Sequence, residues 1–190
     1  KEINGVKVGV LGLSTFELIF DSFFEPAEVT DPIRLASKYV KILREQEGCQ
    51  VVILLTHTGI KEDKNLAQSV PGIDLIVGGH THTMTLRPVY VNGVPIVHVG
   101  YWAQYLGAYD LVYKNGKTEL AHHTIYQIDE TIPEDPATKT MVEGFQQRVV
   151  EKFGNIFNDN IVKSDVFLPL GDSLTENVLA NWAVDAIRKA

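Results

Sequence analysis

The pattern of apolar and polar positions divides the first part of the chain into five segments. Short, largely apolar runs at 6–13, 49–57 and 73–79 are typical of strands buried within a sheet. Apolar residues at helical spacing between the first two runs predict a helix that begins at Asp31 and Pro32 and continues to about Glu47. A shorter polar helix is predicted over 61–70. The order strand, helix, strand, helix, strand predicts a layered α/β fold.

The pattern changes after the third apolar run. Two pairs of strand-like segments, at 87–100 and 107–129, each surround an Asn-Gly dipeptide. Asn-Gly between apolar runs is a strong hairpin signal, because both residues tolerate the positive φ of a tight turn. We therefore predict an antiparallel meander here and no further βαβ unit. The stretch 13–30, which has mixed signals and several aromatic residues, is predicted to be a loop packed on the core.

A break in the pattern near Pro133 and Pro136 separates the last part of the chain. A helix is predicted over 137–153, a strand-like stretch over 161–170, and an amphipathic helix over 172–190. One strand and one helix bury little apolar surface by themselves. We therefore predict a first domain over 1–132, a linker helix over 133–157, and the start of an incomplete second domain over 158–190.

Composition and charge narrow the function classes. The sequence has 45% apolar and 22% charged residues, which is typical of a globular protein with a sizeable core. A net charge of -7 argues against a sequence-independent grip on DNA or RNA, which requires a basic face. No run of about 18 uncharged apolar residues occurs, so no transmembrane helix is predicted. The single cysteine excludes an internal disulfide. The chain opens almost directly on an apolar run and without methionine, so we expect an internal fragment or a processed product.

Three of the six histidines lie where buried strands end. His57 closes the run 49–57, and His80 follows the glycines that close 73–79. Because the carboxyl ends of strands in layered α/β folds form the ligand crevice, these two side chains should converge. His82 lies two residues further on, where a tight loop can turn it to the same place. Imidazole is a good ligand for Zn, Mn, Fe, Co and Ni, so we predict a metal site. The alternative is that these histidines are polar loop residues held by backbone hydrogen bonds.

The other three histidines have a different setting. His122 and His123 are adjacent in a predicted strand, so their side chains point to opposite faces and cannot easily share a metal ion. We interpret this segment as an exposed strand. His98 also lies in a predicted strand. We interpret it as a satisfied core or edge histidine, with a supporting role behind the metal ligands as the alternative.

The segment VVILLTHTG…LAQSVPGIDLIVGGHTHT resembles the C-terminal half of the calcineurin-like metallophosphatase domain, as found in 5'-nucleotidases and their periplasmic relatives. The resemblance implies an α/β (α+β layered) fold, the second half of a four-layer αββα sandwich that holds two metal ions. It matches His57 to the lone strand-end histidine of that family, and His80 and His82 to its Gly-His-x-His motif. His57 and His80 would then bind one ion, and His82 the other.

The first-half motifs of that family do not occur in this sequence. It contains no Asp-x-His, and Gly154-Asn155 is followed by Ile-Phe where the family has His-Glu. Three neutral imidazoles cannot hold two divalent ions, so we expect the bridging carboxylate, the general-acid histidine and the other ligands outside this chain. We predict no catalytic residue in the chain and at most one weakly held ion. The parent enzyme would use two divalent ions, with Zn or Mn favoured.

The end of the chain carries a second resemblance. TENVLANWAVDAIR is similar to the first helix of the 5'-nucleotidase C-terminal domain, and with the first resemblance it covers most of the chain. The matching residues are Glu176, Asn181, Asp185 and Ala186. Thr175 stands where the family often has an Arg that holds substrate anions, and Ala180 stands where it has Gly.

The Gly-Asp-Ser-Leu at 171–174 also spells a serine-esterase motif. We reject that reading, because Ser173 and Glu176 form a capping box ahead of an apolar helical pattern. The Asp-x-x-His that such an esterase needs is also absent from the end of the sequence.

The resemblance implies a fragment of a metal-dependent phosphoric ester hydrolase that acts on nucleoside 5'-phosphates or related nucleotide esters. Two ions about 3.5–4 Å apart clamp a phosphoryl group and generate hydroxide near neutral pH. The expected partner is a small nucleotide or phosphoester and not a nucleic-acid polymer. The resemblance also implies a periplasmic or cell-surface location. Two alternatives stay open: a thiosulfohydrolase-like relative of the same fold, and a non-catalytic binding or interaction module that has lost the metals.

Overall fold

The computed structural model describes residues 1–15, 30–155, 163–165, 167–168 and 177–189. The chain divides into two compact units, Lys1–Pro133 and Glu134–Ala190, and each is described by itself. The prediction of a linker over 133–157 and of a further domain over 158–190 stays a prediction.

Three predictions fall wholly or partly outside the described residues. These are the packed loop at 13–30, the strand-like stretch at 161–170, and the capping box with its Gly-Asp-Ser-Leu at 171–176.

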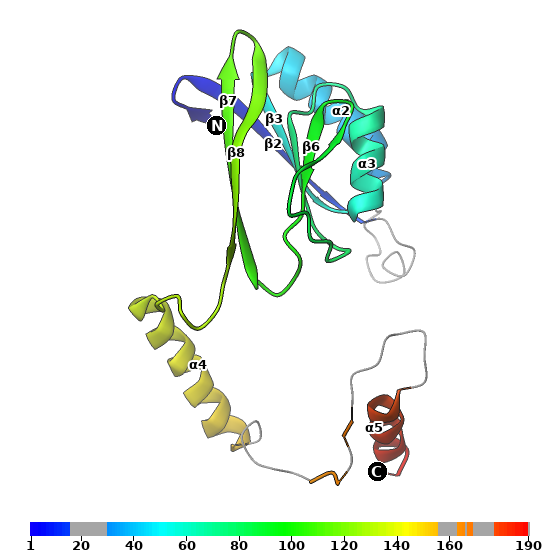
Figure 1. Ribbon diagram of the computed structural model, residues 1–190, viewed down its shortest axis with the longest axis vertical. Helices are drawn as coiled ribbons and strands as arrows, with labels where there is room; N and C mark the ends of the chain where they lie inside the picture. The colour runs from blue at the N-terminus through cyan, green and yellow to red at the C-terminus, as the bar shows by residue number, and fades with distance from the viewer. Residues whose placement is uncertain (16–29, 156–162, 166, 169–176, 190) are drawn as a thin grey trace. The chain divides into compact units, whose positions relative to one another are not determined.

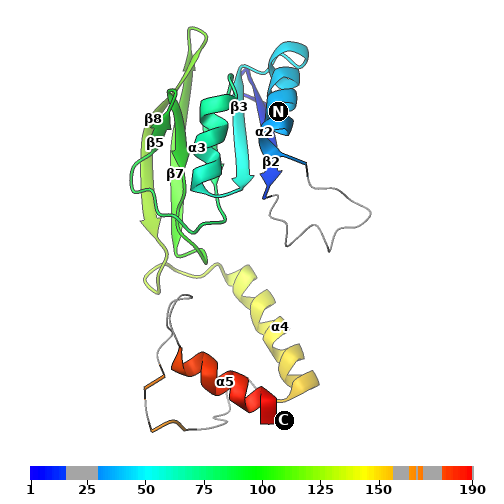
Figure 2. The same cartoon turned by 90° about the vertical axis from the view of Figure 1, so that its right-hand side faces the viewer.

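The first unit is built on a six-stranded sheet with the order β1-β2-β3-β4-β6-β5 (Figures 1 and 2). The strands are β1 (Glu2–Ile3), β2 (Val6–Ser14), β3 (Val51–His57), β4 (Leu75–Gly78), β5 (Val89–Val91) and β6 (Val94–Val97). Strands β2, β3, β4 and β6 pair in parallel, and β1 and β5 add antiparallel edges. The prediction of a layered α/β fold is therefore confirmed, but the strands are buried on one face only, as β2 shows.

The prediction of one antiparallel meander after β4 is wrong. Strand β6 pairs in parallel with β4, through Ile76 with Ile96 and Val77 with Val97, so the first hairpin belongs to the main sheet. Only the second hairpin, β7 (Tyr105–Lys114) and β8 (Lys117–Gln127), forms a separate two-stranded sheet. All four residues of β6 are buried, as is typical of a strand inside a parallel sheet. The Asn-Gly turns are confirmed, but a turn does not determine which further strand a hairpin joins.

Helices α2 (Pro32–Lys41) and α3 (Ile60–Ser69) cover one face of the sheet (Figure 1). The predicted start of α2 is confirmed, because the Asp31 side chain accepts a hydrogen bond from the Arg34 N–H at 3.0 Å and Pro32 occupies the first turn. The last part of this helix, Ile42–Gln46, has π-helical hydrogen bonding, which the apolar spacing alone does not reveal.

The apolar core lies between this face and the two helices. Leu54 of β3, Leu66 of α3 and Ile76 of β4 are fully buried there. The opposite face of the sheet is open, and Val10 and Leu55 are about half exposed on it. The β7–β8 hairpin lies on that side of the sheet (Figure 1). A cavity of about 460 Å³ separates β7 from the sheet.

The second unit contains α4 (Pro136–Phe153) and α5 (Val178–Lys189), so both predicted helices are confirmed over their described residues. Asp135 begins α4, and the hydrogen bond from the Thr138 backbone N–H lowers the pKa of its carboxyl. At the start of α5, the Asn177 side chain accepts a hydrogen bond from the Ala180 N–H at 3.0 Å. None of the described helices is both long and apolar enough to span a membrane.

Substitutions at Leu54 and Leu55, which are neighbours on β3, test whether the sheet is buried on one face only. Leu54→Ala should lower the free energy of unfolding of this chain by about 2–5 kcal/mol, because it leaves a cavity in the core. Leu55→Ala should cost less than about 1 kcal/mol, because 48% of Leu55 is exposed. Chemical denaturation followed by circular dichroism measures both values. Equal losses at the two positions would contradict the open face.

Candidate metal centre

The parallel register brings the ends of β2, β3 and β4 to one edge of the sheet. Ser14 pairs with His57, and Thr56 pairs with Gly78. Side chains alternate along β3, so His57 lies on the same open face as Leu55. An open groove at this edge is lined by the last residues of β2, β3 and β4 and by Gly79.

His57 and His80 come together at this edge, as the strand-end argument predicts. Their ring centroids are 5.2 Å apart and the ring planes are inclined at 63°. Since a metal–imidazole bond is about 2.1 Å long, two imidazoles that share an ion have centroids on the order of 5 Å apart. Gly79 allows the approach, because a Cβ there would lie 3.1 Å from Nδ1 of His57. The spacing of this pair fits a shared ion.

His82 lies in a different setting. Its ring packs against Tyr101, with centroids 5.1 Å apart. Within the described ranges, no three His, Cys, Asp or Glu side chains gather closely enough to hold a metal ion. The described side chains alone therefore do not make up a complete metal site. The metal-binding roles of His57, His80 and His82 stay predictions.

Thr81 attaches the loop between His80 and His82 to α3. Its Oγ1 accepts a hydrogen bond from the Ile60 N–H at 3.1 Å and lies 3.0 Å from the Oγ1 of Thr83. Gly59, at the N-cap position of α3, has no side chain to satisfy this N–H, so the loop supplies the hydroxyl. The start of α3 is thereby held to the loop that carries His80 and His82, which we call the histidine loop.

Backbone strain concentrates around the same loop. His80 has φ 79° and His82 has φ 53°, while Trp102 and Ala103 both have φ 55°. This left-handed region costs a non-glycine residue roughly 1–2 kcal/mol. The other non-glycine residues with positive φ in the described part of the chain are asparagines of Asn-Gly turns, where the conformation is expected. The strained positions thus lie in two loops that meet where His82 contacts Tyr101, and such strain is typical of functional sites.

The remaining histidines follow the sequence interpretation only in part. His122 is exposed on β8, and His123 is partly buried with its ring stacked on Tyr109 at a centroid distance of 6.4 Å. His98 is a buried core histidine, but it is only partly satisfied, because its Nδ1 has no hydrogen-bond partner among the described residues. It also lies one residue beyond the end of β6 and not within the strand.

Asp63 is the residue of this region that the sequence analysis missed. It lies on α3, is fully buried, and accepts a hydrogen bond from Nε2 of His98 at 2.6 Å. A signal was present, because Asp63 precedes the buried Leu66 and Ala67 by three and four residues and so lies on the apolar face of the helix. A carboxylate on that face requires a buried partner.

Comparison with known proteins adds the family. No protein-family model matches the sequence. The chain is 30% identical over 183 residues to the trifunctional nucleotide phosphoesterase protein YfkN of Bacillus subtilis, covering 88% of this chain and 12% of that protein. Two solved structures from Thermus thermophilus, the sulfate thiohydrolase SoxB and a 5'-nucleotidase precursor, each match 80% of the chain with a TM-score of 0.68. Their sequence identities are 28% and 26%, and the match covers 28% and 34% of their chains.

The chain spans about a third or less of the first curated relatives that it matches. The matches nevertheless extend over most of this chain and agree with the layered α/β fold described above. The resemblance seen in the sequence is thus confirmed: over most of its length the chain is similar to part of proteins of the 5'-nucleotidase family of metallophosphoesterases.

Proposed function

We propose that this chain supplies the second-half ligands of a dinuclear nucleotide phosphoesterase and is inactive by itself. The observation that carries the proposal is the convergence of His57 and His80 at the carboxyl edge of the sheet, beside a sheet face that is still open. Relatives named as a nucleotide phosphoesterase and a 5'-nucleotidase support the reaction class.

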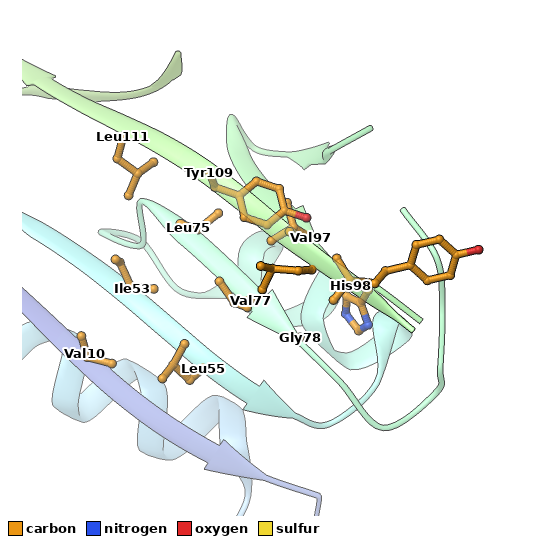
Figure 3. A pocket seen from close by; sticks show the side chains of 14 residues that line it. Val10, Ile53, Leu55, Leu75, Val77, Gly78, Val97, His98, Tyr109 and Leu111 are labelled. Carbon is orange, nitrogen blue, oxygen red and sulfur yellow. The ribbon is translucent and has the colours of Figure 1, made fainter. Parts of the chain in front are cut away.

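The open face supports the proposal that a layer of the domain lies outside this chain. Figure 3 shows Val10, Ile53 and Leu55 of the sheet facing a cavity whose other side carries Tyr109 and Leu111 of β7. Burial raises the pKa of the Tyr109 hydroxyl at this cavity. A core sheet normally buries both faces in a layered domain, and a large exposed apolar patch marks a surface that another element covers. A second sheet on this face would complete an αββα sandwich.

The roles within the centre follow from the donor atoms. His57 and His80 hold one divalent ion and His82 contributes to a second, with Zn and Mn suited to imidazole and carboxylate ligands. When bound, such a pair of ions neutralises phosphoryl charge and lowers the pKa of bound water. The chain itself positions the imidazoles, through the close approach at Gly79 and the hydrogen bond from Ile60 to Thr81. The bridging carboxylate and the general acid come from outside the chain.

The proposed substrate is a nucleoside 5'-phosphate or a related nucleotide ester, and the proposed location is the periplasm or the cell surface. A thiosulfohydrolase-like activity is the second candidate. The specific observation in its favour is the match to the sulfate thiohydrolase SoxB, which has the same TM-score as the match to the 5'-nucleotidase precursor.

Metal binding by the isolated chain tests the proposed half-centre, meaning the part of the metal site formed by His57, His80 and His82. His57→Ala and His80→Ala should each weaken Zn²⁺ or Mn²⁺ binding more than about tenfold, because even loss of a residue that supports a ligand costs 10- to 100-fold. His122→Ala is the matched control, since His122 is exposed on β8. Isothermal titration calorimetry gives the affinities. Equal affinity in the wild type and both variants would overturn the assignment.

Activity tests the reaction in a longer protein that contains this chain and the missing layer. That protein should hydrolyse a nucleoside 5'-monophosphate, and His57→Ala should lower kcat/KM at least about 100-fold. The chain alone should release no phosphate. Phosphate release is the measurement, with a sulfate-releasing thiosulfonate substrate assayed in parallel. Sulfate release without phosphate release would favour the second candidate.

Leu55 tests whether the open face is covered in that longer protein. Leu55→Ala should then cost about 2–5 kcal/mol of unfolding free energy, because the side chain becomes part of a core. Denaturation of the longer protein with and without the substitution measures the difference. A cost as small as that expected in the isolated chain would mean that no layer covers this face.

A further inference from the structure

Asp63 and His98 form a hydrogen-bonded pair enclosed beneath the histidine site. Their side chains are 0% and 1% exposed, and Nε2 of His98 donates to Oδ2 of Asp63 at 2.6 Å. The second carboxylate oxygen, Oδ1, accepts a hydrogen bond from the Thr58 hydroxyl at 2.8 Å. Hydrogen bonds in such a low-dielectric interior are strong and directional, so the pair fixes the position of whatever touches it.

The pair touches the segment that carries each predicted ligand. Thr58, which donates to Asp63, directly follows His57. Gly78 lies two residues before His80, and a Cβ there would fall 2.0 Å from Nε2 of His98 and 2.1 Å from Oδ2 of Asp63. The end of β4 therefore rests directly on this hydrogen bond, with no space for a side chain.

The third link leads to the segment after His82. The Thr85 hydroxyl accepts from the His98 N–H at 2.8 Å and donates to the His98 carbonyl at 2.9 Å. The Thr85 N–H donates to the same carbonyl at 3.0 Å. Thr85 lies three residues beyond His82 and is buried. The backbone of His98 is thus attached to the histidine loop while its ring is attached to α3.

A role in stability alone does not account for this pair. Replacing two buried hydrogen-bonded polar groups by apolar side chains of similar shape is often neutral or stabilising, so burial of Asp63 and His98 is weak evidence for a stabilising function. Moreover, Nδ1 of His98 is buried without a hydrogen-bond partner in the described part of the chain, which is unfavourable for the fold. The three links to the segments that carry His57, His80 and His82 point instead to a role in positioning those segments.

We propose that Asp63 and His98 are positioning residues for the metal centre, which act through Thr58, Gly78 and Thr85 to fix His57, His80 and His82. This inference rests on the proposed half-centre, because it assigns the pair to the ligands of that site. It differs from the ligand assignment itself, since neither residue is placed on the metal.

The main test replaces the pair without creating a large cavity. The double substitution Asp63→Ala with His98→Leu nearly conserves the combined side-chain volume and removes both polar groups. The isolated chain should remain folded, with its denaturation midpoint close to that of the wild type, while Zn²⁺ or Mn²⁺ affinity by calorimetry falls about 10- to 100-fold. The single variant His98→Gln should keep most of the wild-type metal affinity, because its amide N–H can still donate to Asp63. A folded double variant with wild-type affinity would overturn the proposal.

A milder variant keeps the test decisive if the double variant does not fold. Thr58→Val removes only the link between Asp63 and the residue after His57, and should lower metal affinity severalfold in a folded chain. Thr124→Val on β8 is the matched control and should leave the metal affinity unchanged. Unchanged affinity in folded Thr58→Val would overturn the positioning role. A wild-type chain that binds neither ion would contradict the half-centre itself, which separates the two failures.

Discussion

The hydrogen bond between His98 and Asp63 occupies the space where a side chain at residue 78 would lie, and the carboxyl edge of the sheet depends on that constraint. Because position 78 is glycine, β4 can pass directly over the pair and continue into the loop with His80. The same pair joins α3 to the segment after β6, so helix layer and sheet layer meet at one polar contact. This contact fixes how the helix layer and the sheet layer lie against each other at the end of the sheet that carries the histidines.

The sheet of the first unit is buried on one face, and its other face is largely open. The helix-facing side chains of β3 are enclosed by α2 and α3, and they provide the core of the first unit. On the other face, the apolar side chains such as Leu55 line a cavity, and His57 lines the open groove at the carboxyl edge. Leu55 and His57 alternate with core residues along β3, so any layer added on this face would cover exposed apolar surface and also lie beside His57.

Local patterns in the sequence predicted the local structure well. Apolar runs located β2, β3 and β4, Asp31 located the start of α2, and the Asn-Gly dipeptides located two hairpin turns. Strand order and the buried pair were not predictable in the same way, because they depend on contacts between distant segments. Strand β6 could pair with β4 or with β7 on its pattern alone, and Asp63 is 35 residues from its partner His98. The convergence of His57 and His80 was predictable only because parallel strands end at a common edge.

Trp102 gives the strained loop an optical property. It is one of two tryptophans in the sequence, is 82% exposed, and stacks edge-on against Tyr101, whose ring also contacts His82. The other tryptophan, Trp182, belongs to α5 in the second unit. The indole fluorescence of the first unit therefore comes from Trp102, which is linked through the Tyr101 ring to the candidate ligand His82. A change in the arrangement of these loops should change that fluorescence.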